Sequence, residues 1–130
     1  WVVDLDTVMP GSLLHDFGDL VRSSASRAPE DAAANVAEAE LFEGLAAGFL
    51  RGAGDMLAPA ELELLETAGR LITYEQAVRF LVDHLQGDLY YRITRPEQNL
   101  DRARAQLALL RSLEQQTAGF AAIVSRIARS

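Results

Sequence analysis

The sequence contains neither cysteine nor lysine, and each absence removes a class of chemistry. Without cysteine there is no disulfide framework and no thiolate zinc site. Without lysine, the 12 basic residues are all arginine, which together with abundant alanine is typical of a GC-rich bacterial genome. A chain without disulfides suits a reducing compartment, so we expect a cytoplasmic protein.

Long apolar runs and a basic leader segment are also missing. No stretch approaches the roughly 20 apolar residues that a membrane-spanning helix needs, and no positively charged segment opens the N-terminus. The formal net charge of −7 argues against a nucleic-acid partner, because phosphate neutralisation supplies most of that affinity. We therefore predict neither a membrane nor a nucleic-acid partner. Because the first residue is Trp1 and not methionine, we expect a segment of a longer protein.

The sequence does contain enough apolar material for one folded domain. Its 130 residues are 49% hydrophobic, and a domain of this size buries roughly two-thirds of the surface that its unfolded chain exposes. We therefore expect residues 1–130 to form a single domain.

The N-terminal part predicts a strand, a turn and a helix. The run from Trp1 to Leu5 is apolar and rich in β-formers, as in a short strand. A Pro-Gly turn follows, and Ser12 is a suitable N-cap for a helix from Leu13 to about Ser24. Small and polar residues between this helix and the next predict a loop.

The remainder of the chain predicts helices. Apolar residues near the 3.6-residue period indicate a helix over residues 36–51 and another that starts at Pro59 and ends at Gly87. A last helix starts at Pro96 and can continue past Gly119. The face that we expect the helix after Pro59 to bury comprises Leu62, Leu65, Ala68, Ile72, Tyr74, Val78, Leu81 and Leu85. In the last helix we expect burial of Leu100, Ala103, Leu107 and Leu110.

Two carboxylates, Asp4 and Asp6, end the predicted strand. Residues two apart on a strand point to the same face, so both carboxylates can address one point. Mg²⁺ is typically held by one or two carboxylates together with substrate phosphates. Taken alone, the spacing indicates a metal site or two solvated turn residues about equally.

The pattern continues from the strand into the first predicted helix. The strand reads Val2-Val3-Asp4, and the helix carries His15-Asp16-Phe17-Gly18-Asp19-Leu20-Val21-Arg22. Together they resemble the metal-binding end of the aminoglycoside phosphotransferase-like kinases, a family with a kinase-like fold, and most closely its N-acetylhexosamine 1-kinase branch. The resemblance implies that Asp4 is the Mg²⁺ ligand, that Asp6 assists it, and that Asp16 braces the catalytic loop from behind.

One tripeptide within this region has the same sequence as a motif of another protein family. Asp16-Phe17-Gly18 spells the metal-binding motif of protein kinases, but there the Asp directly follows a strand and the Gly opens a flexible loop. Here the tripeptide falls inside a predicted helix, so we interpret the spelling as coincidence. For the neighbouring His15, a place on the helix surface or in packing is favoured over catalysis.

A second block extends the resemblance, through residues 72–91 and 99–106. It reads as a helix with an arginine, then Gly-Asp with a tyrosine pair, then an Asn-Leu-Asp-Arg helix start. The resemblance implies that Arg79 and Tyr90 contact the sugar.

Two structural alternatives remain open. Arg79 can belong to an ion-pair ladder with Glu75 and Asp83, and Tyr90 and its neighbour Tyr91 can be core aromatics. Asp88 can cap the turn that follows it. The basic stretch of Arg92, Arg95, Arg102 and Arg104 can face phosphates, although a solvated helix face is favoured.

Several parts that phosphoryl transfer requires are absent from the sequence. There is no Gly-rich loop, no lysine for the phosphates and no His-Gly-Asp catalytic loop. We therefore expect no catalytic residue in this segment and no activity of the segment alone. The resemblance implies a parent enzyme that uses ATP and Mg²⁺ to phosphorylate a sugar hydroxyl, most closely the anomeric hydroxyl of an N-acetylhexosamine.

The expected fold is mainly α, the helical C-terminal part of a kinase-like α+β fold with one or two short N-terminal strands. Within it, residues 1–8 form the strand and metal loop, 12–25 a helix, and 36–128 the helical sugar-binding part. We also expect self-association through the face formed by Trp1, Val2 and the first helix. Three other functions remain possible: an aminoglycoside or other alcohol kinase of the same fold, a non-catalytic helical interaction module, and a metal-dependent glycosyltransferase.

Overall fold

The computed structural model describes residue 8 and residues 10–129, and over these residues the chain is mainly helical without a strand. The predicted strand at residues 1–5 lies outside the described residues. The described elements are α1 Leu13–Ser24, α2 Ala39–Ala53, the short 3₁₀ helix η1 Gly54–Met56, α3 Pro59–Leu85, α4 Gln98–Gln115 and α5 Thr117–Ile127.

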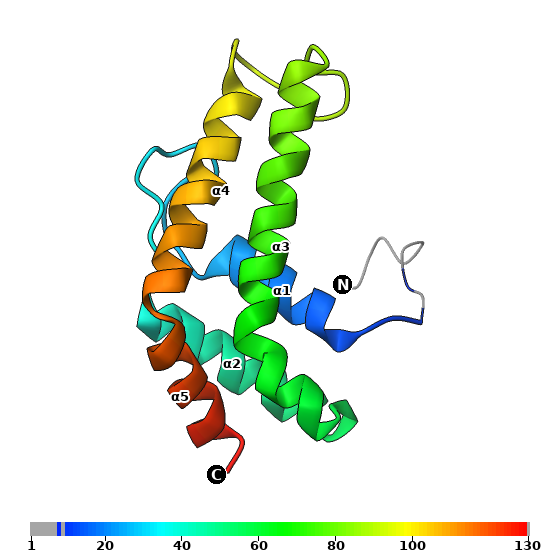
Figure 1. The fold of residues 1–130 in the computed structure, drawn as a ribbon, viewed down its shortest axis with the longest axis vertical. Coiled ribbons are helices and arrows are strands. Elements are labelled where there is room, and N and C mark those ends of the chain that lie inside the picture. The colour runs from blue at the N-terminus through cyan, green and yellow to red at the C-terminus, as the bar shows by residue number, and fades with distance from the viewer. Residues whose placement is uncertain (1–7, 9, 130) are drawn as a thin grey trace.

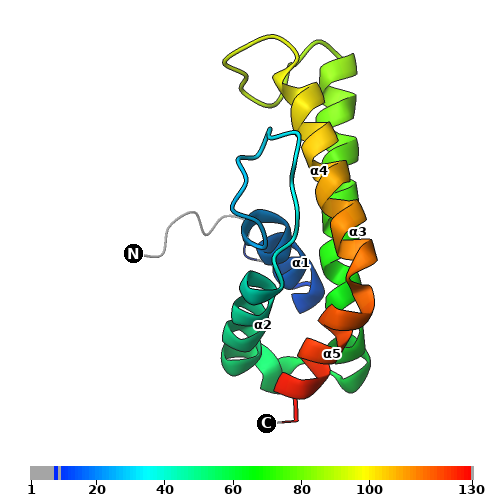
Figure 2. The same cartoon turned by 90° about the vertical axis from the view of Figure 1, so that its left-hand side faces the viewer.

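The helices lie in two layers (Figures 1 and 2). The long helix α3 runs antiparallel to α4, and the connector between them, residues 86–97, lies at one end of the molecule. Figure 2 shows that α1, α2 and the loop between them lie together on one side of the α3–α4 pair. α5 lies at the end opposite the connector, close to α2. Among the described residues no helix is both long and apolar enough to cross a membrane.

The first helix begins and ends where the sequence predicts. The side chain of Ser12 accepts a hydrogen bond from the backbone N–H of Leu14 at 3.2 Å and so caps the helix. Gly18 lies where α1 crosses α3. A Cβ atom there would lie 2.5 Å from the side chain of Ile72 and 2.7 Å from the carbonyl oxygen of Ala68. Only glycine therefore permits this approach of the two helices.

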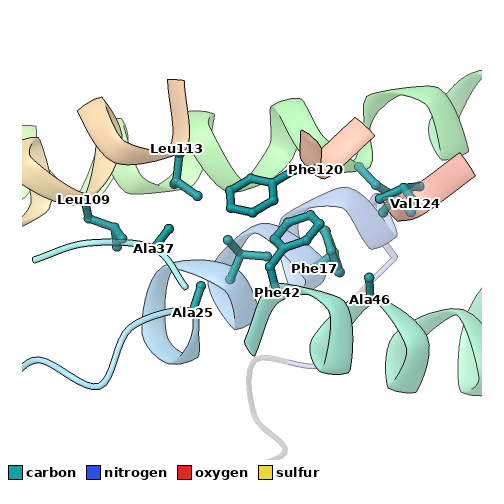
Figure 3. Packing of buried hydrophobic residues seen from close by; sticks show 11 residues of the cluster. Phe17, Ala25, Ala37, Phe42, Ala46, Leu109, Leu113, Phe120 and Val124 are labelled. Carbon is teal, nitrogen blue, oxygen red and sulfur yellow. The ribbon is translucent and has the colours of Figure 1, made fainter. Parts of the chain in front are cut away.

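Aromatic side chains from α1, α2 and α5 build the main core (Figure 3). The rings of Phe42 and Phe120 stack with their centroids 4.1 Å apart, and Phe17 meets Phe42 edge-on at 6.0 Å. All three phenylalanines are buried. In α4, Leu113 lies near Phe120, and Leu109 extends the cluster toward Ala37. Such pairs add roughly 0.5–1.5 kcal/mol to what area burial alone provides.

The second half of α3 buries a different face from the predicted one. Leu65 and Ala68 are buried as expected, but four residues predicted to follow them are exposed: Tyr74, Val78, Leu81 and Leu85. The buried positions of this half are instead Thr73, Ala77, Phe80 and Asp83. Both stripes satisfy the helical period. The buried face carries a small residue, Ala77, which lets neighbouring helices approach α3 closely. It also carries Thr73, whose hydroxyl is satisfied within α3 because it donates to the Gly69 carbonyl oxygen at 2.7 Å.

The C-terminal helix is also different from the prediction. It begins at Gln98 and not at Pro96, and it breaks at Gln116, so that α4 and α5 are separate helices. The amide of Gln116 donates to the carbonyl oxygen of Ala37 at 2.9 Å, which fixes the break against the loop before α2. Leu107, predicted to be buried, is 39% exposed, whereas Ala103 is buried as expected.

The loop before α2 is longer than predicted. α2 starts at Ala39, three residues after the expected start, and ends at Ala53. The backbone N–H of Ala37 donates to the hydroxyl of Ser112 at 3.0 Å, in place of a helical hydrogen bond.

Candidate functional site

A buried carboxylate, Asp83, organises the connector between α3 and α4. Near the end of α3 it accepts hydrogen bonds from the backbone N–H groups of Leu89, Tyr90 and Tyr91, at 3.0, 2.8 and 3.0 Å. The side-chain amide of Asn99 donates to it at 2.9 Å. Asp83 therefore fixes the connector's backbone and does not belong to the ion-pair ladder that we considered for this helix.

The surroundings of Asp83 set its pKa in two opposing ways. Burial, the largest single effect, raises the pKa, because a charged carboxylate loses hydration. The N–H groups of Tyr91, Tyr90 and Leu89 stabilise the ionised form, and together they hold the pKa below its ordinary value of 3.8. The carboxylate is therefore ionised at neutral pH.

The first turn of α4 continues this network. Asn99, which is completely buried, also donates to Asp88 at 2.9 Å. Asp88 has a positive φ of 58° and binds Asn99, so it does not cap the following turn as we considered. Arg102 donates to Asn99 at 2.9 Å and to the carbonyl oxygen of Arg92 at 3.1 Å. Its guanidinium also pairs with Glu30 at 3.0 Å, which joins the connector, α4 and the loop before α2.

The two tyrosines of the connector have different environments. Tyr91 packs on Phe80 with ring centroids 4.7 Å apart, and its hydroxyl accepts a hydrogen bond from Gln76 at 3.1 Å. Tyr90 meets Tyr91 edge-on at 4.8 Å and remains 75% exposed. Of the pair, Tyr91 is the aromatic that anchors the connector, and Tyr90 is available to a ligand.

Arg79 lies beside this tyrosine pair. Its guanidinium is 3.9 Å from the carboxylate of Glu75, and the Arg79 side chain is 51% exposed. The same guanidinium is 6.0 Å from the centroid of the Tyr91 ring. The ion pair with Glu75 is long and exposed, and such pairs contribute little stability. The donors of Arg79 therefore remain accessible.

The structure brings Arg79 and Tyr90 together on one concave surface. Both line a groove of about 290 Å³ against the end of α3. Both also line an adjoining hollow of about 510 Å³, which we call the cleft. The residues that line the cleft are Arg22, Glu30, Gln76, Arg79, Phe80, Tyr90, Tyr91, Arg92 and Arg102.

The predicted basic stretch is divided between two environments. Arg92 and Arg102 line the cleft. Arg95 instead pairs with Asp101 at 2.7 Å and with Asp31 at 3.0 Å, and Arg104 pairs with Asp101 at 3.2 Å. The hydrogen bond from Arg95 lowers the pKa of both Asp31 and Asp101. Half of the basic stretch therefore lines the cleft. Of the other half, Arg95 ties α4 to the loop before α2, and Arg104 pairs within α4.

The predicted metal residues are not part of this cleft. Asp4 and Asp6 lie outside the described residues. Asp16 is exposed in the first turn of α1, as is its neighbour His15, and the tripeptide that begins with Asp16 lies within α1 as expected. Within residues 10–129, no three Asp, Glu or His side chains gather in a way that could hold a metal ion.

Sequence reasoning missed the residues that shape the site. Asp83 and Asn99 were not assigned to it, although a carboxylate four residues before Gly87 and a polar residue at the start of α4 were visible. The sequence alone does not show that Asp83 and Asn99 lie close together in the fold. No protein-family model matches this sequence.

Proposed function

We propose that this chain is the sugar-binding C-terminal part of a small-molecule kinase of the aminoglycoside phosphotransferase-like class, acting on an N-acetylhexosamine. One observation supports this above the others. Arg79 and Tyr90, chosen from the sequence by resemblance, line the same cleft although eleven positions separate them. A buried network around Asp83 holds Tyr90 in that position.

The chemistry of the cleft suits a polyhydroxylated ligand. A guanidinium carries five N–H donors and accepts nothing, so Arg79 and Arg92 offer donors to hydroxyl oxygens. An exposed tyrosine supplies an apolar ring face with a polar tip, which suits the C–H face and hydroxyl edge of a sugar ring. The 510 Å³ of the cleft lies within the range of small-molecule sites.

The remaining parts of the reaction lie outside the cleft. In this proposal Asp4, assisted by Asp6, holds Mg²⁺, which supplies charge neutralisation at the phosphates of ATP. Asp16 braces the catalytic loop. The nucleotide site and the catalytic base belong to another part of the longer protein, so the segment binds sugar without transferring phosphate.

Binding of N-acetylglucosamine to residues 1–130, followed by NMR chemical-shift titration, tests the proposal. We expect shifts at residues 79 and 89–92. Arg79→Ala and Tyr90→Ala should each weaken binding about tenfold, the loss of one or two hydrogen bonds or of a ring contact.

Matched controls exist on the same helices. Arg111→Ala on α4 and Tyr74→Ala on α3 remove exposed side chains that do not line the cleft, and neither should change affinity. A folded chain that binds no sugar, or one whose controls weaken binding as much as the cleft variants do, would contradict the proposal. Transfer itself is tested by phosphorus NMR on the longer protein, where Asp4→Ala should abolish the anomeric phosphate signal.

A second candidate is a non-catalytic helical interaction module. It is favoured by the exposed stripe on α3, in which Leu71, Tyr74, Val78 and Leu85 are 56, 54, 41 and 75% exposed. An apolar stripe of this length is typical of an interface. If the chain is such a module, we expect it to bind a protein through α3 and to bind no sugar.

A further inference from the structure

A further hollow, next to the cleft, lies between α1, α4 and the loop before α2. Its volume is about 140 Å³, and we call it the inner cavity. The side chains that line it are mostly polar: Arg22, Ser23, Ser26, Ala28, Glu30, Asn35 and Gln106. Ser23 and Glu30 are exposed, so the inner cavity opens to the surface, but polar groups that are buried at its wall are costly unless they find partners.

Two of the lining side chains are buried amides whose oxygen atoms have no hydrogen-bond partner among the described residues. Asn35 is 4% exposed and Gln106 is 2% exposed. Within the described residues, neither the Oδ1 atom of Asn35 nor the Oε1 atom of Gln106 accepts a hydrogen bond. A buried acceptor left unpaired costs roughly 1–3 kcal/mol. No donor among the described residues reaches either atom, so a ligand that enters the inner cavity can supply one.

The inner cavity adjoins the cleft. Arg22 and Glu30 line both hollows, so the two meet at these side chains. Each is held in position. Arg22 pairs with Asp19 at 2.7 Å, and Glu30 pairs with Arg102 at 3.0 Å. A substituent that extends from the cleft toward the two amides therefore passes Arg22 and Glu30.

We propose that the inner cavity receives the acetamido substituent of the sugar held in the cleft. This inference rests on the proposed function. An acetamido group carries one N–H donor and one carbonyl acceptor, and a side-chain amide offers the matching oxygen and NH₂. The acetamido N–H supplies the donor that the Asn35 or Gln106 oxygen lacks, and its carbonyl accepts from an amide NH₂. The group is neutral, so it enters beside Glu30 without charge repulsion.

This arrangement makes the inner cavity a specificity site. A hexose that carries a hydroxyl in place of the acetamido group leaves one or more of these amide groups unpaired. Sites built to hydrogen-bond a substituent discriminate strongly against analogues without it, because their own polar groups are then left unsatisfied. The cleft would contribute affinity for the ring, and the inner cavity would distinguish N-acetylhexosamines from plain hexoses.

The experiment compares N-acetylglucosamine with glucose on residues 1–130 by NMR titration. Gln106→Met keeps the side-chain length and removes the amide. We expect it to reduce the preference for N-acetylglucosamine over glucose about tenfold, with glucose affinity unchanged. Asn35→Ala should act in the same direction. Gln115→Met, at an exposed position on α4, is the matched control and should leave the preference unchanged.

The outcomes separate the two proposals. If Arg79→Ala weakens both sugars but Gln106→Met leaves their ratio unchanged, the inference is wrong and the proposed function stands. If the unsubstituted chain binds neither sugar, both are wrong. Thermal unfolding of Gln106→Met tests whether a change in sugar binding is caused by a loss of folded protein. Because the substitution removes a buried unpaired acceptor, the melting temperature should not fall, and a variant that fails to fold is replaced by Asn35→Ala.

Discussion

At the scale of single residues, Asp83 organises the connector between α3 and α4. One carboxylate accepts three backbone hydrogen bonds and one from a side chain, and so converts a connector between two helices into a defined surface. An ionised carboxylate is well suited to this role, since charge-assisted hydrogen bonds are stronger than neutral ones.

The stability of the protein should consequently depend on pH through Asp83. Its pKa in the folded chain lies below the ordinary 3.8, so the folded state binds fewer protons than the unfolded state in this range. The resulting stabilisation is fully present above about pH 4 and is lost as the pH falls through the folded pKa. Asp83→Asn should flatten the dependence of the unfolding free energy on pH below about 4.

Urea unfolding between about pH 2.5 and 7 measures this effect. Asp31 and Asp101 also have lowered pKa values, so Asp83→Asn should reduce the slope without removing it. Asp55→Asn, at an exposed position, is the control. An unchanged slope in Asp83→Asn would show that the carboxylate contributes nothing to acid sensitivity.

At the scale of the elements, the crossing of α1 and α3 depends on one glycine. Gly18→Ala places a methyl group 2.5 Å from Ile72 and 2.7 Å from the Ala68 carbonyl oxygen. Backbone cannot give way as a flexible side chain can. We expect a loss of about 1–3 kcal/mol in the free energy of unfolding, as in other overpacked cores.

A second glycine in a helix provides the opposite test. At Gly44 in α2, no atom lies within 4 Å of where a Cβ would stand. Gly44→Ala should therefore stabilise the fold by roughly 0.5–1 kcal/mol, because alanine favours helix. Denaturant unfolding of both variants measures the difference. Equal effects at the two positions would mean that the crossing does not require glycine.

The elements also show how far the sequence determines the fold. The cap at Ser12 and the proline at the start of α3 are local signals, and they predicted these helix starts correctly. The buried face of α3 was predicted wrongly because two apolar stripes compete, and only tertiary packing selects one. The break at Gln116 has no glycine or proline to announce it. It depends on Ala37, which is 79 positions away.

In the candidate site, too, local sequence signals do not show which residues tertiary packing brings together. Arg79 and Tyr90 were found through a resemblance, and their common place in the cleft required the fold. Asn35 and Gln106 carry no local signal at all, because one lies in a loop and the other on the buried side of α4. Periodicity predicts that a residue is buried but does not predict which hollow it faces.

At the scale of the whole molecule, Arg102 joins three parts of the site. It contacts the connector at Arg92, the start of α4 at Asn99 and the loop at Glu30. Its guanidinium also lies 5.5 Å from the centroid of the Phe80 ring. Lysine has the same charge but cannot reproduce a planar fork with several fixed donors.

Arg102→Lys should therefore loosen the site while the rest of the fold remains intact. We expect faster amide hydrogen exchange at residues 89–92 and near residue 30, with unchanged exchange in α2 and α5. Arg104→Lys is the control, because Arg104 is exposed and, among the described residues, its one ion pair is with the neighbouring Asp101 on its own helix. Uniformly faster exchange across all helices would show instead that Arg102 supports global stability.

The separation between the aromatic core and the cleft has an evolutionary consequence. Helices α2 and α5, which carry the stacked rings of Phe42 and Phe120, lie toward one end of the molecule, whereas the connector lies at the other end (Figure 1). Substitutions at exposed positions of the cleft, such as Arg79 and Tyr90, therefore leave the stacked phenylalanines in place. A lineage built on this scaffold can change what it recognises by small, individually tolerated steps, without first acquiring spare stability.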